Sequence, residues 1–370
     1  MKAPFESSHL KPPIRILCIA GARPNFMKLA PLFRAFASAP EFDPVLVHTG
    51  QHYDDKMSGQ FFRDLGLPTP AHNLEVGSSS HAQQTADIMK RFEPVLLQEA
   101  PRAVLVVGDV NSTVACALVA QKLGVFVIHV EAGLRSFDRS MPEEINRLVT
   151  DAISDLLLVT EESGLQNLKN EGAAVEKVVF VGNLMIDSLY FHLERSKSSQ
   201  ILENLGLRGQ RFGLITLHRP SNVDDPAQLG ELLRALRVIA DDVPLYFPVH
   251  PRTRARLQDM EIGSRIHLLE PLGYLDFVCL MAQSTIVLTD SGGIQEETTA
   301  LSVPCLTLRG NTERPITIQE GTNRLAGTSY ESVLNAWKQT VSSPRTGKIP
   351  KLWDGQAAER CVAAIRAVLA

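Results

Sequence analysis

The sequence predicts an α/β protein made of two doubly wound parallel sheets in tandem, and three observations lead to this fold class. The chain has 370 residues, more than one hydrophobic core ordinarily supports, so we expect two domains. Short, apolar, β-branched runs recur along it, separated by amphipathic helical patterns. The alternation occupies both halves, and continuous apolar strands of this kind are typical of parallel sheets covered on both faces.

In the first half, the spaces between the apolar runs have the periodicity of helices. Leu29, Leu32, Phe33 and Phe36 follow one such pattern, and a second begins behind Pro142. The strands predicted between these helices are Ile14–Ala20, Val45–His48, Val104–Val107, Phe126–Val130, Leu156–Val159 and Val178–Val181.

The second half repeats the pattern. The polar segment Glu194–Gln200 indicates a loop or helix end near the domain boundary, so we predict one domain over 1–187 and another over 188–354. An Ala-rich amphipathic helix is expected at Ala357–Leu369. The strands predicted here are Phe212–Leu217, Leu245–Val249, Ile266–Leu269, Ile286–Thr289 and Pro304–Leu308.

Composition narrows the class of function. Apolar residues make up 44% and charged residues 21%, a normal balance for a soluble globular protein. The net charge of -4 lacks the basic bias of nucleic-acid binders, so an acidic ligand would need a local cluster of cations. No apolar run approaches the ~20 residues needed to cross a bilayer, and the N-terminus has no secretory-signal core. We therefore expect a cytoplasmic protein with no nucleic-acid or membrane partner.

The cysteines give no sign of a metal site. They are isolated from one another, without a C-x-x-C pair or a His/Cys spacing typical of zinc. Most lie in apolar runs, which predicts buried, reduced thiols. They are Cys18, Cys116, Cys279, Cys305 and Cys361.

Polar clusters follow the predicted strands, where open parallel sheets bind their ligands. After the first strand, a glycine turn with Arg23 and Lys28 opens a helix. This arrangement suits an anion, although two solvated cations beside a tight turn would give the same pattern. Asp109 follows Gly108 after a later strand, as either a catalytic carboxylate or a helix N-cap.

Two further acids stand close to arginines in the first half. Glu131 lies directly beyond a buried strand, where a carboxylate is costly unless it is used or paired, and Arg135 is its obvious structural partner. Glu143 and Arg147 are four residues apart on one helical face, which an ordinary surface ion pair would also produce.

The second half contains the sharpest cluster, Asp290–Glu297. Its Ser291-Gly292-Gly293 allows the backbone to approach an anion at a helix N-terminus, and Glu297 can accept hydrogen bonds from vicinal ribose hydroxyls. The pattern is not G-x-G-x-x-G with a distant acid, which argues against a dinucleotide cofactor. His218 and His250 each end a strand near an arginine, an arrangement that suits contact with phosphate groups.

Taken in order, these motifs resemble the UDP-N-acetylglucosamine 2-epimerase family. The resemblance runs from about residue 14 to 327 and implies a GT-B-like fold with an interdomain cleft, in which the last helix, 355–370, packs back on the first domain. It also implies a homodimer, a UDP-sugar substrate, and no metal or other cofactor. The motifs are Gly21-Ala22-Arg23-Pro24 with Lys28, Gly50-Gln51-His52, Gly108-Asp109, His129–Arg135, Pro142-Glu143-Glu144 with Asn146-Arg147, His218-Arg219, Asp290–Glu297, Thr312-Glu313-Arg314-Pro315 and Glu320-Gly321-Thr322.

The family's reaction is the reversible C2 epimerisation of UDP-GlcNAc to UDP-ManNAc, for surface polysaccharide precursors. It proceeds by anti elimination of UDP to 2-acetamidoglucal, followed by readdition. By resemblance, the acid/base carboxylates are Asp109, Glu131 and Glu143, assisted by Lys28, Arg147 and His218. Carboxylates grouped near a phosphate-binding, partly desolvated cleft can have the raised pKa values that such acid/base chemistry requires. The residues implied in substrate binding are Arg23, His250, Phe277 beside the uracil, Ser291, Gly292, Gly293, Glu297 on the ribose, and Arg314.

The sequence departs from the family's pattern at one place. Many bacterial members have an allosteric UDP-GlcNAc site lined by a Gln-His-Arg run, whereas this chain has Gln51-His52-Tyr53-Asp54 and no arginine in Val76–His81. The Gly50–Asp54 form also resembles relatives that act on 2,3-diacetamido-glucuronate UDP-sugars, so that sugar stays open as a substrate. Three rival functions also stay open: a hydrolysing epimerase, a GT-B glycosyltransferase with a UDP-sugar donor, and a non-catalytic nucleotide-sugar sensor.

Overall fold

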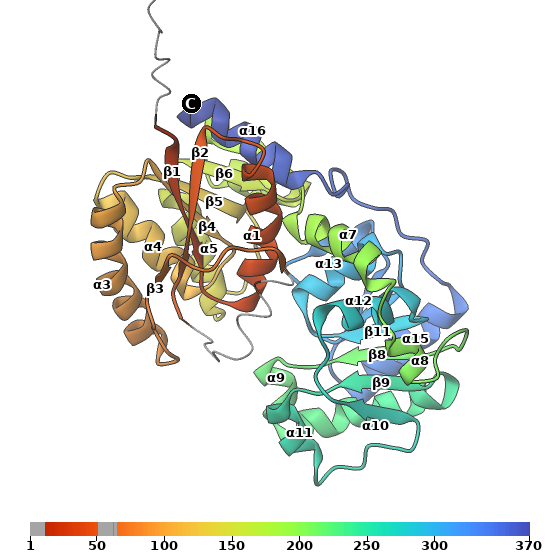
Figure 1. Cartoon of the computed structure of the whole chain (residues 1–370). Coiled ribbons are helices and arrows are strands. Elements are labelled where there is room, and N and C mark those ends of the chain that lie inside the picture. Colours follow the sequence, from red (N-terminus) through yellow and green to blue (C-terminus); the bar gives the residue numbers. More distant parts are fainter. Residues whose placement is uncertain (1–11, 51–61, 63–64) are drawn as a thin grey trace, which may run out of the picture.

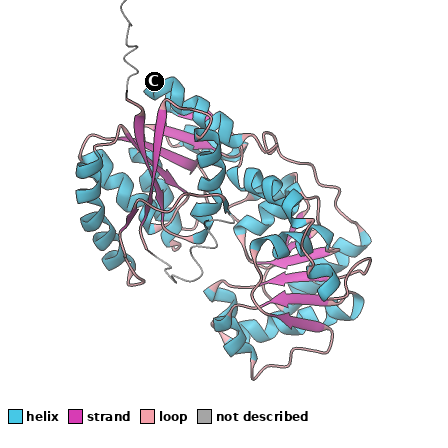
Figure 2. Cartoon of the chain, in the orientation of Figure 1, coloured by secondary structure: helices cyan, strands magenta, loops and turns pink. Residues whose placement is uncertain are grey.

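The computed structural model describes residues 12–50, 62 and 65–370. Within these ranges the chain forms two parallel sheets, each with helices on both of its faces, lying side by side (Figures 1 and 2). The predicted α/β class with two tandem sheets is therefore confirmed.

The first sheet is seven-stranded, in the order β3-β2-β1-β4-β5-β6-β7, and all its neighbours pair in parallel. Its strands are β1 (Ile14–Ala20), β2 (Phe42–His48), β3 (His72–Asn73), β4 (Ala103–Val107), β5 (Phe126–Ala132), β6 (Leu156–Val159) and β7 (Val178–Phe180). The helices around it are α1 (Arg23–Phe36), α3 (His81–Glu99), α4 (Asn111–Lys122), α5 (Pro142–Ile153) and α6 (Glu162–Asn170), with a 3-10 turn at Val175–Lys177.

The second sheet is six-stranded and also parallel, in the order β10-β9-β8-β11-β12-β13. Its strands are β8 (Gly213–Thr216), β9 (Leu245–Pro248), β10 (Ile266–Leu269), β11 (Ile286–Thr289), β12 (Cys305–Thr307) and β13 (Asn323–Leu325). The helices of this half are α8 (Ile201–Asn204), α9 (Pro220–Val223), α10 (Pro226–Asp242), α11 (Pro251–Leu257), α12 (Tyr274–Gln283), α13 (Gly292–Ala300), α14 (Pro315–Gln319) and α15 (Tyr330–Ser342).

The predicted strands are all present, most of them shifted by one to three residues at an end. Two edge strands, β3 and β13, were not predicted. They contain only two and three residues, and His72-Asn73 and Asn323-Arg324 are not apolar, so neither produces the hydrophobic run by which strands are found.

Two helices join the halves. Helix α7 (Leu184–Ser196) contacts α1 from the first half and both α12 and α13 from the second, and it contains the boundary placed at 187/188, which stays a prediction. Helix α16 (Ala357–Leu369) returns to α1 (Figure 1). The carboxylate of Asp187 accepts hydrogen bonds from the amides of Ala357 (3.1 Å) and Ala358 (2.7 Å), which fixes the start of α16.

The apolar face of α16 belongs to the core of the first sheet. Cys361 and Ile365 are fully buried there, together with residues of β1, β4 and α1. All five cysteines are free and buried, as the sequence predicts. Among the described residues, every helix is too short or too polar to span a membrane.

Candidate active site

A cavity of about 1190 Å³ lies between the two halves, and its lining comes from both. The side nearest the first sheet follows strands β4 and β5 and the start of α5. The opposite side follows β8, β9 and β11. The sequence-predicted site residues found together in its wall are Lys28, Asp109, Glu131, Glu143, Arg147, His218, His250, Phe277, Ser291, Gly292, Gly293, Glu297 and Arg314.

Two predicted features lie outside what the structure describes. The backbone of Arg23 begins α1, but its side chain is not among the described ones, so its expected contact with the diphosphate stays a prediction. The segment Gln51–Asp54 also falls outside the described residues, and with it the comparison of that run with the allosteric site.

Glu131 ends β5 in an unusual backbone conformation. Its φ is 74°, and the register of β5 against β6 shifts between Val130 and Ala132, so a β-bulge surrounds it. A non-glycine residue in the left-handed region is uncommon and in a strand marks local strain. The bulge brings the carboxylate to the cavity although only 6% of the residue is exposed.

The partners of Glu131 are cations from both halves of the protein. One oxygen pairs with the ammonium of Lys28 on α1, and the other accepts from Nη2 of Arg314 at 2.5 Å. Burial alone would raise the pKa of Glu131, but Lys28 and Arg314 lower it below its ordinary value. Glu131 therefore does not have the raised pKa that a desolvated cleft can produce, and its carboxylate is held ionised.

The predicted pairing of Glu131 with Arg135 is also wrong. The Arg135 guanidinium instead contacts Asp151 (2.7 Å) and Glu171 (2.6 Å), away from the cavity wall. Because the bulge turns the backbone at the end of the strand, nearness in sequence does not bring these two side chains together.

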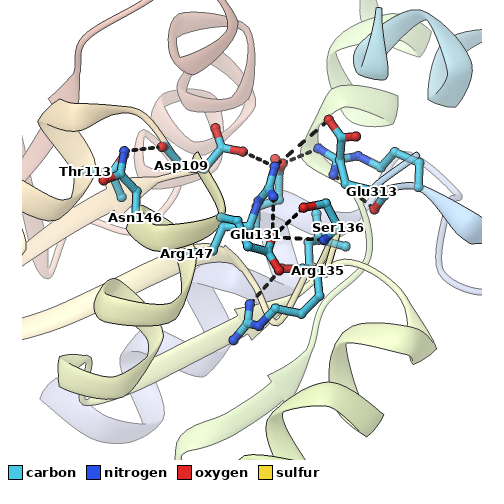
Figure 3. A network of polar contacts seen from close by, with 12 residues as sticks. Asp109, Thr113, Glu131, Arg135, Ser136, Asn146, Arg147 and Glu313 are labelled. Carbon is cyan, nitrogen blue, oxygen red and sulfur yellow. Dashed lines mark hydrogen bonds and ion pairs between the residues drawn. The ribbon is translucent and has the colours of Figure 1, made fainter. Parts of the chain in front are cut away.

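Asp109 and Arg147 form the second acid–base pair of the wall, at 2.5 Å (Figure 3). Asn146 donates to the backbone oxygen of Asp109 (2.8 Å), so α5 fixes both the turn and its carboxylate. The ion pair expected between Glu143 and Arg147 is replaced by one between Glu144 and Arg147 at 2.7 Å, because three-residue spacing suits this helix face. Glu143 lines the cavity.

The opposite wall is the N-terminus of α13. Gly292 and Gly293 begin this helix shortly after β11. The first amides of a helix have no acceptor within it, so they can bind an anion. Asp290, fully buried, organises the neighbouring loop: it accepts from the amides of His218 and Arg219 and contacts His218 Nδ1 at 2.9 Å. Burial raises the pKa of Asp290, but the hydrogen bond from His218 and the backbone donors lower it below its ordinary value.

Glu297 lies one turn further along α13, as a ribose ligand would require. It is buried, and Tyr274 donates its hydroxyl to Oε1 at 2.8 Å. Burial raises the pKa of Glu297 to about 7, although the hydrogen bond from Tyr274 lowers it. Phe277, on the same helix as Tyr274, lines the cavity beside it.

Three residues of the wall, Arg219, Glu296 and Glu313, were quoted within motifs but not predicted as functional, whereas Arg314 was predicted to bind the substrate. Arg314 donates from Nε to Glu296 at 2.7 Å, so one guanidinium joins a carboxylate of α13 to Glu131 of β5. Glu313 contacts Arg219 (3.1 Å) and Arg309 (2.7 Å). Burial raises the pKa of Glu313, but Arg314, Arg309 and Arg219 lower it below its ordinary value. These contacts link distant segments, and the only signal for them in the sequence is the charged composition of the motifs.

Comparison with known proteins identifies the family. A sequence model of the family described as UDP-N-acetylglucosamine 2-epimerase matches residues 34–366. The chain belongs to this epimerase family. It is 40% identical to the UDP-N-acetylglucosamine 2-epimerase of Methanocaldococcus jannaschii, over 94% of this chain and 98% of that one. It is also 40% identical to the UDP-2,3-diacetamido-2,3-dideoxy-D-glucuronate 2-epimerase of Pseudomonas aeruginosa, with the same coverage.

The structure agrees with this epimerase family. A crystal structure of the M. jannaschii UDP-GlcNAc 2-epimerase in complex with UDP-GlcNAc and UDP superposes with a TM-score of 0.88 at 39% identity, covering 96% of this chain and 100% of that chain. The fold is therefore GT-B-like, with two Rossmann-like domains, and the protein is an isomerase of the epimerase type.

Proposed function

We propose that the protein converts UDP-GlcNAc reversibly to UDP-ManNAc. The observation that carries this proposal is the pairing of two unlike walls across one cavity. The N-terminus of α13, with Glu297 one turn on, suits a nucleoside diphosphate, and Asp109, Glu131 and Glu143 face it from the other domain. A glycosyltransferase needs the wall that binds the diphosphate, but it would not require the three carboxylates of the other domain.

The proposed reaction is an elimination followed by an addition. A base removes the proton at C2 while the C1–O bond breaks and its electron pair leaves with UDP, giving 2-acetamidoglucal. UDP then adds back to C1 and C2 receives a proton on the other face. Acid/base groups must be in reach of C2, and UDP must be retained between the steps.

The geometry supports acid/base chemistry at one wall and UDP binding at the other. Lys28 and Arg314 hold Glu131 ionised, the form that accepts a proton. Arg147 fixes the carboxylate of Asp109 at 2.5 Å. On the UDP side, Ser291, Gly292 and Gly293 would hold the diphosphate with His218 and His250, while Glu297 would accept from the ribose and Phe277 would lie beside the uracil.

UDP-2,3-diacetamido-2,3-dideoxy-D-glucuronate is the second candidate substrate, because the P. aeruginosa relative is as similar as the archaeal one. Its C6 carboxylate would need a cation. Along the described wall, however, four cations are already paired with carboxylates. The pairs are Lys28 with Glu131, Arg147 with Asp109, Arg219 with Glu313, and Arg314 with Glu296. This charge balance favours the uncharged C6 of UDP-GlcNAc, so its kcat/KM is expected to be the larger of the two.

Incubation with UDP-GlcNAc in deuterated water, followed at C2 by NMR, tests the reaction. Deuterium at C2 together with UDP-ManNAc is the expected result. Free ManNAc and UDP would instead identify a hydrolysing epimerase. An unexchanged substrate would refute the proposal for this sugar and leave the diacetamido-glucuronate epimerase, a transferase or a sensor.

From the family resemblance we also infer a cytoplasmic homodimer. Composition supports the compartment, since the chain combines ordinary globular composition with free, buried cysteines. Light scattering coupled to size-exclusion chromatography tests the dimer: a mass of one 40.6 kDa chain would refute it.

A further inference from the structure

The backbone around Glu131 is held in a form that a strand does not adopt by itself. Glu131 has a φ of 74° and Gly133 a φ of 83°. At Gly133 a side chain is excluded, because a Cβ there would lie 2.5 Å from the carbonyl oxygen of Gly164. Glu131 has no such freedom, so surrounding contacts must keep its conformation.

One carboxylate supplies such contacts on both sides of Glu131. Asp151, near the end of α5, contacts Nδ1 of His129 at 2.6 Å and accepts from the amide of Gly133 at 3.0 Å. His129 lies two residues before Glu131 and Gly133 two residues after it. Arg135 pairs with the same carboxylate at 2.7 Å. Asp151 therefore spans the bulge with both oxygens engaged.

The same contacts extend to the turn that carries Asp109. The Nε2 atom of His129, a fully buried residue, lies 2.9 Å from the backbone oxygen of Gly108. A carbonyl oxygen only accepts, so Nε2 carries a hydrogen. Burial raises the pKa of Asp151, but His129 and Arg135 lower it below its ordinary value, so the carboxylate is ionised. The ring of His129 thus joins Asp151 to Gly108.

We propose that Asp151 is a positioning residue for the epimerase site: it clamps the β5 bulge that aims Glu131 and, through His129, fixes the turn that carries Asp109. This inference rests on the proposed function only for the roles of Glu131 and Asp109. Asp151 is absent from the cavity lining, so it acts through the residues it holds. Asparagine keeps the shape of Asp151 but not its charge, so it removes the ion pair with Arg135 and can accept from Gly133 only with its NH2 group turned toward His129.

The chain contains a matched control in Asp155. Its Oδ2 accepts from the amide of Val127, in the same strand, at 2.8 Å and from Gln121 at 2.5 Å. Both aspartates contact β5, but Asp155 holds the strand four residues before Glu131. Asp155→Asn therefore perturbs β5 without touching the bulge.

The experiment compares Asp151→Asn with Asp155→Asn in the full chain, using UDP-GlcNAc in deuterated water and thermal unfolding. Asp151→Asn is expected to lower kcat by about 100-fold and the rate of deuterium entry at C2 in parallel, with KM within about threefold. Asp155→Asn is expected to keep kcat within about twofold at a comparable Tm. Equal kcat in the two variants would overturn the clamp while leaving the proposed function intact.

Two structural measurements keep the clamp testable without turnover. In crystals of Asp151→Asn, residue 131 is expected to leave the positive-φ region; a φ still near 74° would refute the clamp even if the wild type proved inert on UDP-GlcNAc. In the wild type, which needs no variant to fold, 15N NMR of His129 is expected to show a hydrogen on Nε2. A bare Nε2 would refute the link to Gly108.

Discussion

Replacing Glu297 by glutamine removes a buried carboxyl whose ionisation opposes folding. Burial raises the pKa of Glu297 from 4.5 to about 7 in the folded chain. This difference of about 2.5 pH units corresponds, at about 1.36 kcal/mol for each, to about 3.4 kcal/mol in the free energy of unfolding. The full change is reached between low pH, where the carboxyl is protonated in both states, and high pH, where it is ionised in both. The value applies without a correction for solvent, since only 3% of the residue is exposed.

The sign follows from proton uptake. Because the folded state binds the Glu297 proton more tightly, its contribution to stability is fully present below pH 4.5 and is lost as the pH rises to about 7. Glutamine does not titrate. Relative to the wild type, Glu297→Gln should therefore gain about 3 kcal/mol in free energy of unfolding between pH 4.5 and pH 8.

Urea unfolding of both proteins at the two pH values measures this difference directly. Glu144→Gln provides a control of opposite sign. Burial raises the pKa of Glu144, but the amide of Ser136 and the guanidinium of Arg147 lower it below its ordinary value, so this variant should lose stability relative to the wild type as the pH rises toward 4.5 and change little between pH 4.5 and pH 8. A free-energy difference for Glu297→Gln that does not change with pH would refute the burial argument.

Three further predictions concern the site and the fold. Asp109→Asn should lower kcat by about 10²–10⁴-fold while the Kd for UDP, measured by calorimetry, changes less than about threefold; loss of UDP binding would make Asp109 structural. Tyr274→Phe removes the 2.8 Å hydrogen bond that lowers the pKa of Glu297, so less of this carboxyl should be ionised at pH 8. UDP binding should therefore weaken more at pH 8 than at pH 6, and calorimetry showing equal weakening would contradict this. Deleting 355–370 removes the buried face of α16 and should cost more than about 4 kcal/mol of stability, seen as a lower urea midpoint; an unchanged midpoint would show that the helix is dispensable.

The sequence predicts the sheets and the location of the site for one physical reason. In parallel sheets the apolar strands are long enough to recognise, and whatever follows them meets at one edge. For this reason the order of strands and polar clusters places Asp109 and Glu131 together at the edge of the first sheet and Ser291 at the edge of the second, whereas the cleft that joins the two edges was implied by the family resemblance. The same rule fails for β3 and β13, since edge strands of two or three residues leave no apolar run.

Side-chain pairing was less predictable because it depends on contacts between segments far apart in the chain. Arg135 stands four residues from Glu131, yet the bulge at Glu131 directs the two side chains apart, and Glu131 instead pairs with Arg314 of the other domain. The pKa of Glu131 follows from its partners: burial in the cleft alone would raise it, whereas the two buried cations Lys28 and Arg314 lower it and keep the carboxyl ionised.

Arg314 gives the two walls of the cavity a physical connection. Its guanidinium holds Glu131 at 2.5 Å and Glu296 at 2.7 Å, and Glu296 stands on α13 directly before Glu297. Asn183, just before α7, donates to the same Glu296 oxygen at 3.0 Å. The helix that would hold UDP is thus tied to the carboxylate that would act at C2. In an elimination that detaches UDP from the sugar, this tie keeps the leaving group's binding site in register with the acid/base wall, so that readdition can compete with escape of the glycal.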